Sequence, residues 1–194
     1  MGFSFTSVAV KGGTRDAVLA TMGLRGTSVF EEIPESEITG AVLPSGWYLV
    51  TANRGVPTFM EDATLKRLSQ TAEVVYCFVE EHVMCSAACM WADGSQVWFV
   101  MHEAGQKIEH LETKGNLPPI FAPINERLRA EQASAGGNKA KVDHIFDIPV
   151  EMVAQLTGYR HDRVMPELGD KAFEILATTE ATPKRSLFRR LLGV

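Results

Sequence analysis

The 194-residue sequence predicts a single α+β domain, built on a mainly antiparallel sheet with helices packed on at least one face, plus a short basic amphipathic tail. Residues 72–105 hold three consecutive strand-like runs, and short helical patterns precede and follow them. The composition, 45% hydrophobic and 22% charged, is that of an ordinary globular domain. We expect residues 1–178 to form the α+β domain and residues 179–194 to form a linker and tail.

The first part of the chain predicts a strand, a helix and a long connection. Residues 3–10 alternate loosely between apolar and polar side chains, as a strand does. A helix should follow, because Thr14 can cap its start and Gly23 can end it. Residues 24–45 lose this periodicity and are rich in Gly, Pro and acidic residues, which predicts a surface connection.

The middle of the chain predicts the centre of the sheet. Residues 47–52 suggest a buried strand and residues 62–69 a short helix. Residues 74–79 are apolar on both faces, which a strand tolerates when both of its faces are covered. The dipeptide Asp93-Gly94 lies between two strand-like runs and predicts a two-residue hairpin turn.

The C-terminal third predicts three more helices and one strand. A Leu-Pro-Pro sequence should precede a helix that carries Phe121, Ile124 and Leu128 at helical spacing, with Pro123 in its first turn. The polar residues 131–141 predict a mobile loop, and residues 142–146 a last strand.

Asp147 is expected to cap the next helix, which Gly158 would close before a polar turn over residues 159–163. Phe173 and Leu176 predict a final helix over residues 170–177.

The charge is unevenly distributed. The whole chain carries −5, and residues 183–194 carry four basic and no acidic side chains, so the remainder carries −5 − 4 = −9. This acidic body gives no reason to expect nucleic acid as a partner. Three cysteines within residues 77–89, and the lack of a signal-peptide pattern or a long apolar run, predict a cytoplasmic protein without a disulfide framework.

One cysteine and one histidine are candidates for catalysis. The hairpin turn, if it is regular, places Cys85 opposite His102, and an imidazole beside a thiol is how a cysteine becomes a nucleophile. Both residues lie in expected strands, and no oxyanion hole can be identified, so a buried structural cysteine is the simpler interpretation. Cys85 and Cys89 are about 13 Å apart at roughly 3.3 Å per strand residue, too far to share one zinc ion. The sequence therefore predicts no metal site and no cofactor.

A second candidate site is a group of polar residues near the end of the domain. If the last strand and its helix fold back, these residues could line a pocket or a partner surface: Asp143, His144, Asp147, Arg160, His161 and Asp162. Solvated turn charges and a helix cap would explain the same residues.

The tail is the third candidate. Its apolar residues fall on one side of a helical wheel and most of its basic residues on the other. Such a segment can bind an acidic groove on a partner, an anionic membrane surface as a peripheral contact, or the acidic run 31–37 of its own chain. The candidate binding residues are Lys184, Arg185, Leu187, Phe188, Arg189, Arg190 and Leu191.

These features favour a non-catalytic cytoplasmic protein-binding module of bacterial type, comparable to an immunity or adaptor protein, that acts through a protein interface. The acidic body, the separate tail and the lack of a strong catalytic constellation support this hypothesis. The alternative is an enzyme or small-ligand binder that uses Cys85 and His102, or the polar cluster around His144 and His161.

Overall fold

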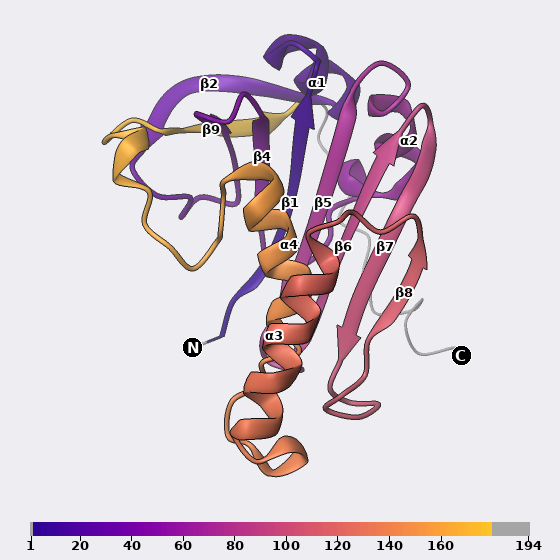
Figure 1. Ribbon diagram of the computed structural model, residues 1–194. Helices are drawn as coiled ribbons and strands as arrows, with labels where there is room; N and C mark the ends of the chain where they lie inside the picture. The colour runs from indigo at the N-terminus through magenta and orange to yellow at the C-terminus, as the bar shows by residue number, and fades with distance from the viewer. Residues whose placement is uncertain (1, 180–194) are drawn as a thin grey trace, which may run out of the picture.

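The computed structural model describes residues 2–179 and places them in one α+β domain around a nine-stranded sheet, all of whose strand pairs are antiparallel (Figure 1). The fold class predicted from the sequence is confirmed. The order of strands across the sheet is β2-β9-β3-β4-β1-β5-β6-β7-β8. In chain order the elements are β1 (Ser4–Lys11), α1 (Arg15–Met22), β2 (Leu24–Glu31), β3 (Ile38–Val42), β4 (Tyr48–Asn53), η1 (Thr58–Met60), α2 (Asp62–Leu68), β5 (Glu73–Glu80), β6 (Cys85–Ala92), β7 (Ser95–Glu103), β8 (Glu112–Gly115), α3 (Phe121–Ser134), η2 (Gly137–Lys139), α4 (Asp147–Thr157), η3 (Pro166–Leu168) and β9 (Phe173–Thr178).

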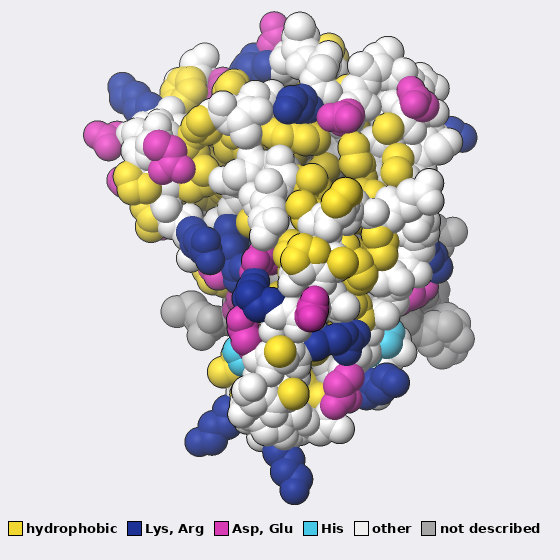
Figure 2. Space-filling view, in the orientation of Figure 1, with side chains coloured by type: hydrophobic (Ala, Val, Ile, Leu, Met, Phe, Trp, Pro, Cys, Tyr) yellow, Lys and Arg dark blue, Asp and Glu magenta, His cyan; other side chains and the backbone are white. Residues whose placement is uncertain are grey.

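Both faces of the sheet bury apolar side chains. Phe5 and Ala9 of β1 point into a core that α3 and α4 cover, whereas Val8 and Val10 point into a second core beneath α1 and α2. Figure 1 shows α3 and α4 in front of the central strands and α2 behind them. Figure 2 shows acidic and basic side chains interspersed on the α3 and α4 side, with apolar side chains visible over the central strands beside these helices. The long apolar runs of the central strands follow from this burial on both faces.

Several local predictions are confirmed. The Thr14 hydroxyl accepts a hydrogen bond from the Ala17 backbone N–H, and Gly23 ends α1 in the left-handed conformation with φ of 68°. Asp93 and Gly94 both have positive φ, 51° and 69°, as a tight turn between twisted strands requires. Gly158 ends α4 in the same left-handed conformation.

The predicted surface connection over residues 24–45 is wrong, because it contains two strands. β2 is an edge strand with an irregularity between Gly26 and Phe30, and β3 has only five residues. Gly40 lies in the middle of β3 because the Tyr48 hydroxyl occupies the space where a Cβ atom would be. The bulge interrupts the alternation of apolar and polar residues in β2, and β3 is short and contains a glycine. Neither strand therefore shows the pattern by which a strand is normally predicted.

The predicted last helix over residues 170–177 is also wrong, since this segment forms β9. Phe173 belongs to the core under α3 and α4, and Leu176 to the core on the other face. A spacing of three places two residues on one side of a helix but on opposite faces of a strand. The sequence pattern was therefore compatible with a strand that is buried on both faces.

The segment before α4 corrects three further predictions. Residues 142–146 form bends and a turn rather than a strand, and α3 continues to Ser134 within the expected loop. The Asp143 carboxylate accepts hydrogen bonds from the backbone N–H groups of Ile145 and Phe146. Asp143 therefore binds the backbone N–H groups that precede α4, and Asp147 is the first helical residue rather than the cap.

The predicted tail over residues 183–194, with all of its candidate binding residues, lies outside the described residues. Among residues 2–179, no helix has the length and apolar character that crossing a membrane requires.

Candidate functional site

The predicted pairing of Cys85 with His102 is wrong. A bulge between Met90 and Trp91 shifts the register of β6 and β7 by one residue, so Cys85 lies opposite Glu103 and His102 lies opposite Ser86. Because neighbouring residues of a strand point to opposite faces, the Cys85 and His102 side chains lie on different sides of the sheet. The structure therefore does not bring the proposed thiol and imidazole together.

The environment of the three cysteines does not activate a thiol. Partial burial, together with the carboxylates of Glu103 and Glu80, raises the pKa of Cys85. Burial raises the pKa of Cys77 and of Cys89 to about 12. A nucleophilic cysteine requires a shift in the opposite direction.

His102 instead forms a buried polar link between β7 and the segment before α4. Its side chain is 0% exposed, with Nδ1 2.7 Å from the His110 carbonyl oxygen and Nε2 2.9 Å from Asp143 Oδ2. A carbonyl oxygen only accepts, so Nδ1 carries a proton. Nε2 and Oδ2 are at hydrogen-bond distance, so the ring connects the His110 carbonyl to the Asp143 carboxylate. The link is structural, since every polar atom of the ring is used.

The polar cluster predicted near the end of the domain separates into distinct groups. Arg160 donates from Nη2 to Asp147 Oδ1 and from Nε to Asp162 Oδ1, both at 2.7 Å. His144 lies elsewhere, with its backbone N–H bonded to the Gln132 side chain. Arg160 and Asp162 thus meet as predicted, whereas His144 does not join them.

His161 packs against aromatic rings and forms no hydrogen bond to these charged groups. Its ring stacks on Phe5 with centroids 5.4 Å apart and meets the edge of Phe3 at 5.2 Å. The side chain is only 4% exposed, and the nearest acidic atom to Nε2 is Glu81 Oε1 at 3.9 Å, beyond hydrogen-bond range. Nε2 therefore has no hydrogen-bond partner among the described residues.

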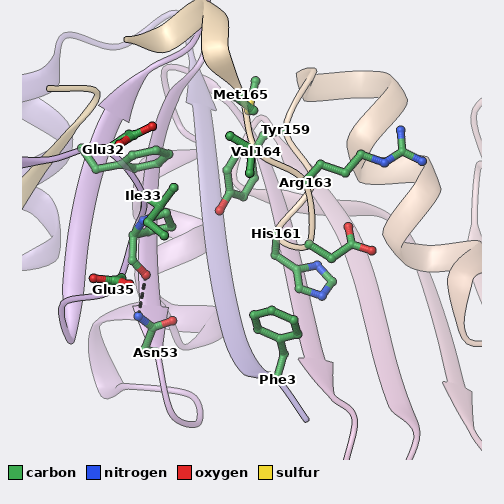
Figure 3. A pocket seen from close by; sticks show the side chains of 13 residues that line it. Phe3, Glu32, Ile33, Glu35, Asn53, Tyr159, His161, Arg163, Val164 and Met165 are labelled. Atoms are coloured by element: carbon green, nitrogen blue, oxygen red, sulfur yellow. Dashed lines mark hydrogen bonds between the residues drawn. The ribbon is translucent and has the colours of Figure 1, made fainter. Parts of the chain in front are cut away.

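A groove of about 470 Å³ opens beside His161 (Figure 3). One wall is the loop between β2 and β3, and the other is the segment between α4 and β9. Figure 3 shows Ile33 reaching in from the first wall and Val164 and Met165 from the second. The lining residues are Phe3, Glu32, Ile33, Pro34, Glu35, Asn53, Tyr159, His161, Asp162, Arg163, Val164, Met165 and Phe173.

The wall that carries Ile33 is held in place by hydrogen bonds. The Asn53 side-chain amide donates to the carbonyl oxygens of Pro34 and Ser36, each at 2.8 Å. The Glu31 carboxylate accepts from the Ser36 backbone N–H and hydroxyl. These hydrogen bonds fix the backbone of the wall, although the wall is exposed to solvent.

The wall that carries Ile33 is negatively charged. Glu32 and Glu35 are exposed, and neither forms an ion pair with another described residue. Figure 3 shows the Arg163 side chain extending away from them. Asp162 is already paired with Arg160. The groove therefore presents two carboxylates beside apolar side chains.

Sequence reasoning identified only part of this groove. His161 and Asp162 are among the candidate residues, and Glu32 and Glu35 belong to the acidic run that is one of the three alternative acceptors of the tail. Ile33 and Val164 were missed, because a single apolar residue within a polar loop is ordinary at a protein surface and gives no signal by itself. The groove itself depends on the position of β9, which the sequence pattern assigned to a helix.

Comparisons of the chain with protein-family models, with curated proteins and with solved structures give no match. Within residues 2–179, no group of three or more His, Cys, Asp or Glu side chains is arranged to hold a metal ion.

The buried His102 link makes a prediction about Asp143. In Asp143→Asn, the amide N–H can donate to His102 Nε2 while the amide oxygen still accepts from the backbone, so we expect a loss of about 1 kcal/mol or less. Asp143→Ala leaves a buried ring nitrogen and two backbone N–H groups without partners and should cost about 3 kcal/mol. Chemical denaturation measures both values, and equal losses would rule out this hydrogen-bond arrangement.

The environment of His161 predicts a pH dependence of stability. Burial lowers its pKa, more than the charges of Asp162 and Glu81 raise it, so the folded protein favours the neutral ring. The resulting stability is full above the ordinary histidine pKa of about 6.5 and is lost as the pH falls from there through the lowered value. In His161→Phe, which keeps an aromatic ring, unfolding free energies between about pH 7.5 and pH 5 should fall less steeply than in the wild type. An unchanged slope would contradict this role.

Proposed function

We propose that this chain is a non-catalytic module that binds another protein through the groove and the neighbouring edge of the sheet. The observation that carries the proposal is the position of its exposed apolar side chains. Of the eight large apolar side chains that are exposed among the described residues, five lie on β2 or line the groove: Phe3, Val29, Phe30, Ile33 and Val164. Apolar side chains gathered at one place on a surface are typical of a protein interface.

The edge strand β2 extends this surface beyond the groove. Its only strand neighbour is β9, so its other edge is unpaired within the described residues. Figure 2 shows apolar side chains at the surface of the lobe where β2 and β9 lie in Figure 1. The irregularity between Gly26 and Phe30 disfavours the addition of a long strand, because a bulge disrupts the ladder of backbone groups. We therefore expect side-chain contacts to supply most of the binding energy.

The alternative is a small-ligand binder that uses the same groove. A volume of about 470 Å³ lies within the range of small-molecule sites, and the candidate residues His161 and Asp162 both line it. Against this alternative, His161 Nε2 is buried and Asp162 is occupied by Arg160. The hypothesis of an enzyme that uses Cys85 and His102 has less support, since the register of β6 and β7 places these side chains on opposite faces of the sheet.

Replacing one exposed valine in the groove tests the proposal. Val164→Asp should weaken binding of a specific partner about tenfold or more, because it places a charge within an apolar contact. Val42→Asp is the matched control: Val42 is 66% exposed and Val164 68%, and Val42 lies at the end of β3 that is remote from the groove. Proteins captured from lysate on immobilised wild type and on both variants are compared, and each candidate is then purified and titrated.

The proposal requires a purified protein whose affinity falls in Val164→Asp and stays within about twofold of the wild type in Val42→Asp. Equal melting temperatures of the two variants exclude unfolding as the cause. If every captured protein binds both variants equally, the groove is not the interface. A small molecule that shifts the wild-type melting temperature, with no protein ligand found, would favour the alternative.

A further inference from the structure

We infer that residues 183–194 of this same chain occupy the groove and compete there with any external ligand. This inference concerns regulation and stands on the groove and the sequence of the tail alone. It holds whether or not the proposed partner exists.

Charge complementarity is the first support. The groove places the exposed carboxylates of Glu32 and Glu35 on either side of Ile33 in the same wall. Residues 183–194 carry four basic side chains and no acidic one, with apolar residues between the basic ones. A basic segment with apolar side chains is complementary to an acidic wall beside an apolar lining.

The point where the described chain ends is the second support. Thr179 is fixed beside Gly23, since its backbone N–H and its hydroxyl both donate to the Gly23 carbonyl oxygen, at 2.8 and 3.0 Å. Phe173, which lines the groove, lies at the other end of β9, six residues from Thr179 and therefore about 20 Å away at roughly 3.3 Å per residue. Six extended residues, from Thr179 to Arg185, cover about the same distance. The basic residues therefore begin within reach of the groove.

Tethering is the third support. A segment joined to the body by a short linker has an effective concentration in the millimolar range at any site that it can reach. An affinity too weak to hold a separate peptide is then sufficient to fill the groove. A competing partner must displace the tail, which lowers its apparent affinity.

The test uses the full chain with the photo-reactive amino acid benzoylphenylalanine in place of Phe188. At a dilution where the chain is monomeric, irradiation should link position 188 to residues 32–35 or 164–165 of the same molecule, as mapped by mass spectrometry. The yield of these links should fall about fivefold or more in the double variant Glu32→Lys and Glu35→Lys, since two attractive charge pairs become repulsive.

Two further variants make the result specific. Glu37→Lys is the matched control, because Glu37 is an exposed carboxylate of the same acidic run that does not line the groove, and it should leave the yield within about twofold. Adding Arg189→Glu and Arg190→Glu to the double lysine variant should restore the links. Links elsewhere on the body, links only between separate molecules, or a yield that ignores the charge of residues 32 and 35 would each overturn the inference.

Discussion

The pairing of β9 with β2 is the contact on which the proposed interface depends. β2 has no other strand neighbour among the described residues, so its attachment to the domain rests on β9 and on the side chains around it. The buried Glu174 of β9 strengthens this attachment, since its carboxylate accepts hydrogen bonds from the Arg15 guanidinium of α1 and from the Ser28 backbone N–H. Ser28 lies in the irregular part of β2 and has a φ of 62°. One carboxylate therefore joins the edge strand, its neighbour and the helix behind them.

The polar residues of the domain serve mainly to hold such junctions. Asp143 connects His102 of β7 to the start of α4, and Arg160 fixes the turn after α4 to Asp147. These pairs satisfy groups whose burial would otherwise be costly. Glu32 and Glu35 differ from these residues, because their carboxylates form no ion pair with another residue in the range 2–179 and lie beside the apolar side chains of the groove. This distribution is the main support for the proposed binding role.

The sequence was informative where local chemistry determines the structure. The cap at Thr14, the stops at Gly23 and Gly158 and the Asp93-Gly94 turn were all predictable from the residue type and its position. The register of β6 and β7 was not, because a single bulge between Met90 and Trp91 shifts it by one residue and no residue type in this segment marks the position of the bulge.

The same limit applied to the candidate site. Phe173 and Leu176 have a spacing that fits both a helix and a strand buried on two faces, and only the position of β9 between β2 and β3 decides between them. Without β9 in the sheet, Ile33 and Val164 have no reason to face the same groove. His161 and the acidic run could be identified as candidates, but their common groove could not.

Hydrogen exchange in Glu174→Ala, measured on the full chain by mass spectrometry, tests most directly whether β9 holds the edge strand and the groove together. Losing the buried carboxylate leaves the Ser28 N–H and the Arg15 guanidinium without their shared partner. We expect amides of residues 24–36 to exchange about tenfold faster or more, with β5 and β6 unaffected, because opening would be local. The exposed Glu73→Ala serves as the control. Unchanged exchange over residues 24–36, or an equal increase across the whole sheet, would contradict this account.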